Sequence, residues 1–220
     1  MSQPKLYLLP GMGANRKMYA PLRETGLAFE VLEFIDPLPK ESLPDYARRM
    51  LQLIPEGEAF YLGGTSLGGV IAVEMAKLRL PLGLILISSC KTSREFPFYF
   101  RLQRYLRLHR IFSGEFMRKH GPRSPRSKLP PDIAEILRSQ REEANPKFID
   151  WAIDAVIHWR SKELPQNVLH IHGTRDGLLP GAFVRGRIPI HGGRHVAAIT
   201  HAGEVAKHIT AFLGKQLVPD

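Results

Sequence analysis

The sequence has one cysteine, no long apolar run and, in one region, few acidic residues. Because Cys90 is the single cysteine among 220 residues, an internal disulfide is excluded and a reducing compartment is favoured. It ends an apolar run and is expected to be a buried, small apolar side chain. The apolar run Leu6–Leu9 is too short for a signal-peptide core, and no stretch approaches bilayer-spanning length. These absences predict a cytoplasmic protein.

Acidic residues are scarce in residues 91–128, which hold 11 Lys and Arg against 2 Asp and Glu, whereas the remaining chain holds 20 against 19. Nearly all of the net charge of +10 therefore lies in one segment. Such charge suits an anionic substrate, an anionic membrane surface or nucleic acid. Because no zinc pattern or basic and aromatic sheet signature accompanies it, the sequence disfavours nucleic acid. Four arginines recur there every three residues, which fits a solvated helix face as well as contact with anionic substrate groups or lipid headgroups: Arg101, Arg104, Arg107 and Arg110.

The rest of the pattern predicts one α/β domain spanning residues 1–220, with a mostly parallel central sheet of about six strands and helices on both faces. The predicted strands are Lys5–Leu9, Phe29–Ile35, Ala59–Leu62, Leu84–Ile87, Val168–Ile171 and Arg187–Ile190. The predicted helices are Asn15–Leu22, Ser42–Ile54, Leu67–Lys77, Phe98–Phe112, Asp132–Glu143, Pro146–Trp159 and Gly203–Leu213. Residues 91–162 contain no convincing strand, so they are expected to be a helical insertion between the fourth and fifth strands, over the sheet edge where such folds bind ligands.

One serine stands at the sharpest predicted corner of the chain. The segment from Gly64 to Gly68 fits the pattern G-x-S-x-G between a strand and a helix, with Ser66 at its centre. The two glycines lie where strand and helix come so close that a β-carbon is poorly tolerated. The following helix directs its free N–H groups and positive dipole end at the serine, so the pattern predicts a nucleophile.

Glycine-rich turns of this kind also bind phosphate, but two such interpretations fail. A P-loop needs Gly-Lys-Ser/Thr at its end, whereas Gly68 is followed by Gly69 and Val70. A dinucleotide fingerprint after the first strand would need a third glycine where the chain has Arg16. We therefore expect no nucleotide cofactor.

A nucleophilic serine requires a base and a carboxylate that orients the base. Asp176, in the tight loop after the fifth strand, is the candidate carboxylate, although an aspartate that merely caps a turn is the structural alternative. Three histidines near the last strand compete for the role of base: His191, His195 and His201. His195 is favoured because it lies on the loop beyond the strand, whereas His191 is still at the strand end and His201 is entering the last helix.

The resulting order of Ser66, Asp176 and His195 resembles the α/β-hydrolase fold family, as do four loops of the chain. These loops are Leu9-Pro10-Gly11-Met12, Gly64-Thr65-Ser66-Leu67-Gly68, His172-Gly173-Thr174-Arg175-Asp176 and Gly192-Gly193-Arg194-His195. The resemblance implies an oxyanion hole made by the backbone N–H groups of Met12 and Leu67, and it identifies residues 91–162 as a lid.

The chain departs from that family in three ways. It has Pro10 where many members have histidine, and it lacks the N-terminal strand pair of the larger members. It also has Arg194 before the base, where many relatives have a small or apolar residue; we expect this side chain to face solvent. None of these departures removes a catalytic group.

His170 and His172 share one face of the fifth predicted strand, a spacing that could also suit two metal ligands. A metallo-hydrolase pattern would need aspartate and histidine close behind, where the chain has Thr174 and Arg175, so we expect two hydrogen-bonded histidines and no metal. The sequence thus predicts a serine hydrolase that cleaves a carboxylic ester through an acyl-enzyme. A thioesterase is the alternative with the same machinery, and a non-catalytic ligand-binding protein is the alternative with the same fold.

Overall fold

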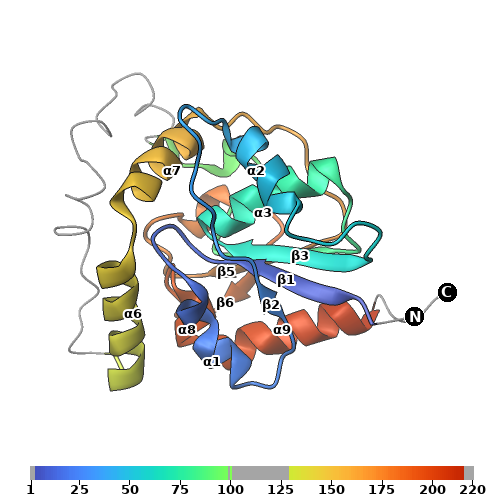
Figure 1. Cartoon of the computed structure of the whole chain (residues 1–220). Coiled ribbons are helices and arrows are strands. Elements are labelled where there is room, and N and C mark those ends of the chain that lie inside the picture. The colour runs from blue at the N-terminus through green and yellow to red at the C-terminus, as the bar shows by residue number, and fades with distance from the viewer. Residues whose placement is uncertain (1–2, 99, 101–128, 216–220) are drawn as a thin grey trace.

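Six parallel strands form the centre of the computed structural model, which describes residues 3–98, 100 and 129–215 (Figure 1). The strands are β1 (Lys5–Leu9), β2 (Glu30–Val31), β3 (Phe60–Thr65), β4 (Leu84–Ile87), β5 (Val168–Gly173) and β6 (Ile188–Ile190). Their spatial order is β2-β1-β3-β4-β5-β6, and every neighbouring pair is parallel. The predicted α/β fold with a mostly parallel sheet of about six strands is confirmed.

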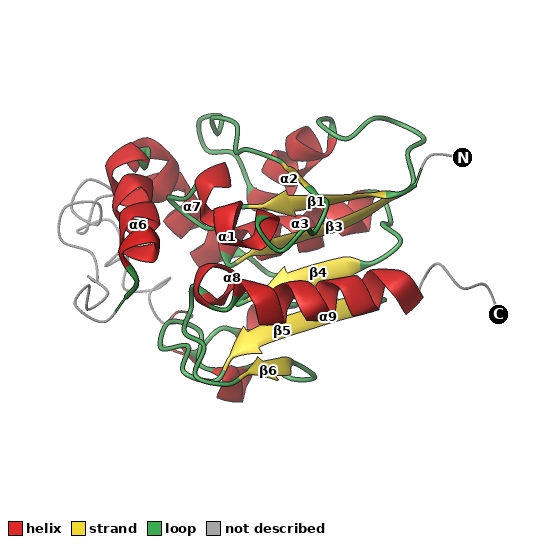
Figure 2. Ribbon diagram, turned by 90° about the horizontal axis from the view of Figure 1, so that it is seen from below, coloured by secondary structure: helices red, strands yellow, loops and turns green. Residues whose placement is uncertain are grey.

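Helices cover both faces of this sheet because successive side chains of each strand point to opposite sides. On β1, Leu6 and Leu8 join a cluster with α1 (Ala20–Arg23), α8 (Ala197–Thr200) and α9 (Ala202–Lys215). Tyr7 and Leu9 join the other cluster, with α2 (Leu43–Leu51), α3 (Leu67–Leu78) and α7 (Pro146–His158). Figures 1 and 2 show the two helical layers on either side of the strands. None of the helices in the described ranges is long and apolar enough to cross a membrane.

The remaining helical elements are short turns and one longer helix: η1 (Arg16–Tyr19), η2 (Ser93–Glu95), α6 (Pro131–Glu143) and η5 (Gly181–Phe183). Capping side chains set several of the helix starts. Ser42 accepts a hydrogen bond from the Asp45 N–H at the start of α2. Asn145 accepts from two backbone N–H groups at the start of α7, with Pro146 as its first residue, so the predicted start of that helix is confirmed.

The second strand is shorter than predicted, because only Glu30 and Val31 of the expected Phe29–Ile35 pair with the sheet. β2 lies at the edge, where its single neighbour β1 pairs through Tyr7 and Leu8 alone. Beyond Leu32 the chain leaves the sheet, and the Phe34 ring stacks on Phe148 of α7 with 4.7 Å between the ring centroids. Packing against a helix from a distant part of the sequence therefore overrides the local strand pattern.

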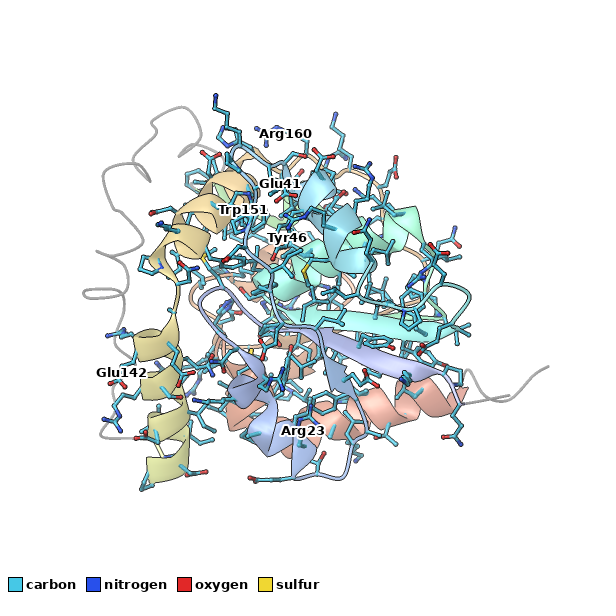
Figure 3. All side chains as sticks on the ribbon, in the orientation of Figure 1. Arg23, Glu41, Tyr46, Glu142, Trp151 and Arg160 are labelled. Atoms are coloured by element: carbon cyan, nitrogen blue, oxygen red, sulfur yellow. The ribbon has the colours of Figure 1, made fainter. Side chains whose placement is uncertain are left out.

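Between β4 and β5 the described chain contains η2, α6 and α7 and no strand. The predicted helix Phe98–Phe112 and the four arginines of residues 101–110 lie almost wholly outside the described residues. The last part of the segment packs firmly on the body of the protein, as Figure 3 shows near Glu41, Tyr46 and Trp151. The Trp151 indole donates to the Glu41 carbonyl at 2.9 Å, and its ring lies 4.3 Å from that of Tyr46.

The end of the chain differs in detail from the prediction. The expected final helix Gly203–Leu213 lies within α9 (Ala202–Lys215), and the short helix α8 before it was not predicted. α8 is four residues long, and three of them, Ala197, Ala198 and Ile199, are buried. A helix this short has too few residues for a periodic pattern to reveal it.

Candidate active site

The predicted site residues all follow carboxyl ends of strands. Met12 follows β1, Ser66 follows β3, Asp176 follows β5 and His195 follows β6. Because all of these strands are parallel, their carboxyl ends share one edge of the sheet. The chain therefore gathers four loops from distant parts of the sequence at one place.

Ser66 occupies a backbone conformation that few residues adopt, with φ 55° and ψ −118°. The residues two before and two after it, Gly64 and Gly68, must be glycine for steric reasons. A β-carbon at Gly64 would lie 2.4 Å from the carbonyl carbon of Gly68, and one at Gly68 would lie 2.3 Å from the Pro10 carbonyl oxygen. The tight turn therefore holds the serine side chain clear of the sheet, at the start of α3.

A continuous chain of hydrogen bonds joins the three predicted side chains. Ser66 Oγ lies 2.9 Å from His195 Nε2, and His195 Nδ1 lies 2.9 Å from Asp176 Oδ2. Because a carboxylate only accepts, Nδ1 carries the imidazole proton and Nε2 is left to accept from the serine hydroxyl. This is the tautomer in which a histidine can remove a proton from serine.

The carboxyl group of Asp176 is fully buried and well supplied with donors. Its Oδ1 accepts from the N–H groups of Leu178 at 3.0 Å and Leu179 at 2.9 Å. Burial by itself raises the pKa of Asp176, but hydrogen bonds from His172 and His195, the charge of His195 and the Leu179 amide together hold that pKa well below its usual range. The group is therefore a carboxylate at neutral pH.

The expected oxyanion donors, the backbone N–H groups of Met12 and Leu67, belong to two segments that lie beside Ser66. Leu67 is the first residue of α3, so its N–H has no carbonyl partner within the helix. A β-carbon at Gly11 would lie 3.9 Å from that of Ser66, which brings the loop holding Met12 beside the serine. Among the described residues, no turn, loop or cap hydrogen bond uses the N–H of Met12 or Leu67. The oxyanion hole that the sequence predicts requires two such donors beside the serine.

The other candidate histidines lie elsewhere. His191 is exposed at the end of β6, and His201 lies between α8 and α9 with its ring beside the Thr200 hydroxyl at 2.8 Å. His195 is the histidine that the structure brings to Ser66. Arg194 next to it is exposed, as expected.

The histidines of β5 are each bound to a backbone carbonyl. His170 Nε2 lies 3.0 Å from the Ser89 oxygen, and His172 Nε2 lies 2.7 Å from the Leu179 oxygen. Burial lowers the pKa of His170 to about 3, so it is neutral. Within the described part of the chain, no group of three or more His, Cys, Asp and Glu side chains is arranged to hold a metal ion.

Two further residues support the serine turn and could not be found from the sequence. The Ser89 hydroxyl donates to the Ser66 carbonyl at 2.7 Å. The buried Tyr19 hydroxyl donates to the Leu9 carbonyl at 2.7 Å and lies 2.9 Å from the Thr65 hydroxyl, so it joins the ends of β1 and β3. Neither residue lies in a motif, and their contacts depend wholly on which strands are neighbours.

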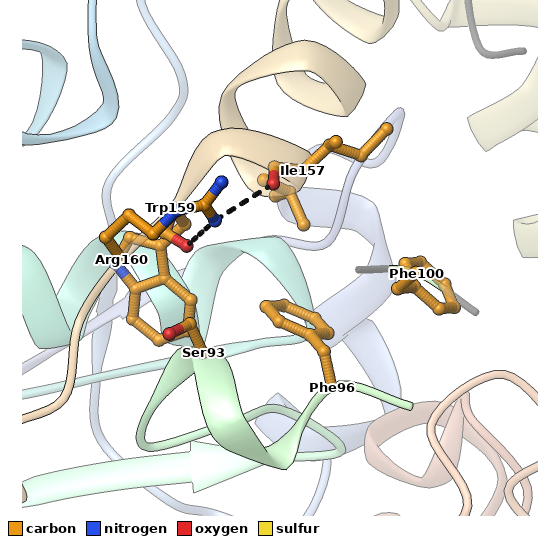
Figure 4. Close-up of a pocket in the computed structure, with 7 residues that line it drawn as sticks. Ser93, Phe96, Phe100, Ile157, Trp159 and Arg160 are labelled. Carbon is orange, nitrogen blue, oxygen red and sulfur yellow. Dashed lines mark hydrogen bonds between the residues drawn. The ribbon is translucent and has the colours of Figure 1, made fainter. Parts of the chain in front are cut away.

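A pocket of about 130 Å³ lies where η2 meets the end of α7 (Figure 4). It is lined by Ser93, Phe96, Phe100, Val156, Ile157, Trp159 and Arg160. The Phe96 ring stacks on Phe100 and meets Trp159 edge to face, each with 5.7 Å between centroids. Phe96 is buried here, whereas Phe98, two residues further on, is exposed.

The strand order, the strained serine turn and the loops that follow β1, β3, β5 and β6 define the architecture: the chain has the α/β-hydrolase fold. Solved structures with this architecture match almost the whole chain. An esterase from Thermogutta terrifontis, solved with malate bound, is 19% identical with a TM-score of 0.72, and the match covers 99% of this chain and 92% of the esterase.

Two other solved structures are similar to the same extent. MenH from S. aureus is 17% identical with a TM-score of 0.74, and the match covers 99% of this chain and 96% of MenH. ClbQ from the colibactin NRPS/PKS pathway is 17% identical with a TM-score of 0.70, and the match covers 98% of each chain. Neither the models of protein families nor the curated protein sequences gave a match. The likeness therefore lies in the fold rather than in the sequence.

Proposed function

We propose that this protein is a serine hydrolase that cleaves a carboxylic ester through an acyl-enzyme intermediate. Ser66 attacks the ester carbonyl while His195 takes its proton, and Asp176 orients His195 and stabilises its positive charge. The Met12 and Leu67 N–H groups bind the oxyanion. His195 then returns the proton to the departing alcohol, and a water molecule activated by His195 releases the acid.

The observation that carries this proposal is the unbroken hydrogen-bond chain from Ser66 Oγ to His195 to Asp176, with 2.9 Å at each step. The strained serine backbone supports it, because such strain persists where the surrounding structure holds it and gathers at functional sites. The similarity to the Thermogutta esterase supports the reaction class at the level of the fold.

We further propose that the segment of residues 91–162, inserted between β4 and β5, is the lid that shapes the acyl or alcohol pocket. Its described helices α6 and α7 pack beside the loops that follow β1 and β2. A lid of this kind sets which substrates reach the serine, and its basic residues would attract a substrate with anionic groups.

The test is hydrolysis of p-nitrophenyl esters, from acetate to laurate, by the purified protein beside Ser66→Ala. We expect turnover by the wild type and a loss of about 10⁴-fold or more in kcat for the variant. Ser139→Ala is the matched control, because Ser139 lies on α6 and, among the residues that the structure describes, its hydroxyl bonds to the Ile136 carbonyl of its own helix. The chain length that is cleaved fastest measures the acyl pocket.

Two outcomes would change the proposal. Cleavage of acyl thioesters without cleavage of any oxygen ester would assign the same machinery to a thioesterase. If no ester or thioester were cleaved and a fluorophosphonate probe left Ser66 unlabelled, the protein would be a non-catalytic ligand-binding member of this fold.

A further inference from the structure

β5 places two histidines in the interior of the protein, on the strand whose following loop carries Asp176. His170 is 2% exposed and His172 is fully buried. Leu169 and Ile171 point to the α9 side of the sheet, so both histidines point to the opposite side, where their rings meet edge to face with 5.7 Å between centroids. Buried imidazoles need hydrogen-bond partners, so their contacts indicate what they do.

Their contacts define which nitrogen carries the proton. Each Nε2 faces a carbonyl oxygen, from Ser89 for His170 and from Leu179 for His172, and a carbonyl can only accept. Each Nε2 therefore donates. Both Nδ1 atoms are buried and have no hydrogen-bond partner among the described residues. A second proton on Nδ1 would be a buried donor without an acceptor, so both rings are neutral.

His172 makes a second contact that links it to the proposed triad. Its Nε2 lies 3.3 Å from Asp176 Oδ2, the same oxygen that accepts from His195 at 2.9 Å. The N–H of His172 is hydrogen-bonded to the Leu179 carbonyl at 2.7 Å, and the same nitrogen lies 3.3 Å from the carboxylate oxygen, close enough for the positive end of the N–H dipole to stabilise the negative charge. The other carboxylate oxygen accepts from the Leu178 and Leu179 amides.

We propose that His172 is a positioning residue for the catalytic acid: its neutral Nε2–H, anchored on the Leu179 carbonyl, keeps the Asp176 carboxylate ionised and directed at His195. This inference rests on the proposed function, because it assigns His172 a role in the same triad. It acts through Asp176 and touches no substrate.

The other titratable groups near Asp176 cannot replace this donor. His195, from the loop after β6, already donates through Nδ1. Cys90, which follows β4, is buried, and burial with the nearby negative charges of Glu95 and Asp176 raises the pKa of its thiol well above the usual value. Cys90 is therefore a neutral thiol and supplies no charge. His172 is the donor that the interior of the protein contributes.

The experiment compares His172→Phe, which removes the donor, with His172→Gln, whose side-chain amide can still donate. In His172→Phe the two backbone amides keep the carboxylate in place, but the loss of the His172 N–H raises the pKa of Asp176. We expect the Asp176 carboxyl carbon to titrate at higher pH in ¹³C NMR. We also expect kcat to fall about tenfold, with KM within about twofold. His172→Gln should recover most of both effects.

His170→Gln is the matched control. It alters the neighbouring buried histidine on the same strand but leaves the contact between His172 and Asp176 intact. We expect the Asp176 titration to be unchanged in this variant. An equal shift of the Asp176 titration in His172→Phe and His170→Gln would show that this titration responds to any change in the histidine pair. That result would overturn the specific role of His172.

The native protein provides a test that needs no variant to fold. Imidazole ¹⁵N NMR near neutral pH should show His172 with its proton on Nε2 and a bare Nδ1; a proton on Nδ1 would overturn the proposal. Unchanged Asp176 titration in His172→Phe would reduce His172 to a packing residue. These NMR results do not depend on turnover, so they are distinguishable from a failure of the serine-hydrolase proposal, which the Ser66→Ala assay detects.

Discussion

Gln140 of α6 binds Asn15 through both the backbone and the side chain. Its Oε1 accepts from the Asn15 N–H at 2.6 Å, and its Nε2 donates to the Asn15 Oδ1 at 2.9 Å. Gln140 is 7% exposed and Asn15 is half-buried, so the pair is partly shielded from water. Asn15 ends the loop that holds Met12, and thus a helix of the inserted segment fixes the position of one proposed oxyanion donor.

Replacing Gln140 by leucine should therefore lower activity without touching the triad. Leucine keeps the volume and leaves the Asn15 N–H without its acceptor, so the loop becomes less well placed for the oxyanion. We expect kcat for p-nitrophenyl esters to fall about tenfold, because a misplaced oxyanion donor loses part of the roughly 10²-fold to 10³-fold effect of its removal. Glu135→Gln on the same helix breaks only an exposed pair with Arg138 and should change neither kcat nor stability measurably. Equal effects of the two variants would show that the loop does not depend on Gln140.

The glycines of the serine turn should be intolerant of a methyl group. In Gly68→Ala the new carbon would lie 2.3 Å and 2.4 Å from the backbone oxygens of Pro10 and Leu9. Because two backbone segments must separate, we expect the free energy of unfolding to fall by about 3 kcal/mol or more. Gly203→Ala is the matched control, since it lies in α9 with no atom within 4 Å of a new β-carbon, and it should stabilise the protein by up to about 1 kcal/mol. Urea unfolding of the two variants measures the expected loss of stability in Gly68→Ala and the expected gain in Gly203→Ala.

Ser66→Gly should stabilise the protein while it abolishes the proposed activity. The serine is held at φ 55° with ψ −118°, a strained region that costs a residue with a β-carbon about 1–3 kcal/mol. Glycine adopts this conformation without that cost, although it also gains freedom in the unfolded chain. The net result expected in thermal unfolding is a higher Tm than that of the wild type. A lower Tm would mean that the serine hydroxyl contributes more to stability than the strain removes.

Asp176→Asn should lower kcat by about 10⁴-fold, because the amide cannot accept the Nδ1 proton and favours the wrong tautomer of His195. It should also change how stability depends on pH. The pKa of Asp176 is held below its usual value in the folded protein, so its contribution to stability is present above the unfolded pKa of about 4 and is lost as the pH falls below it. The difference in unfolding free energy between wild type and variant should therefore shrink on going from neutral pH to about pH 3. A constant difference would contradict the ionised, stabilising role of the carboxylate.

His170 should make the protein sensitive to acid over a different range. Burial lowers the pKa of His170 to about 3, whereas an unfolded histidine titrates at about 6.5. Between these values the unfolded chain takes up a proton that the folded chain does not, so stability falls as the pH is lowered, by up to about 1.4 kcal/mol per pH unit. His170→Gln removes the imidazole that takes up this proton in the unfolded chain. The variant should therefore flatten the dependence of the unfolding free energy on pH between about pH 6 and pH 4. An unchanged slope would show that His170 does not titrate as its burial implies.

Local patterns were sufficient for the serine turn and for most of the elements. Gly64, Ser66 and Gly68 stand at fixed spacing because the steric demands of the turn act over a few residues. The start of α7 at Pro146 was predictable for the same reason, since Asn145 caps it locally. The second strand was overestimated because its end depends on Phe148, more than a hundred residues away in sequence.

The sequence by itself determined the alternation of strands and helices, the serine turn and the candidate carboxylate Asp176 in its tight loop, since each is encoded by residues close to one another. The tertiary structure decided which of the three histidines lies beside Ser66, because that depends on how the loops after β5 and β6 meet at the sheet edge. It also decided that Gln140 holds the Asn15 loop and that His172 shares an oxygen of Asp176 with His195. Contacts of this kind join side chains that only the folded sheet brings together, so no spacing in the sequence could reveal them.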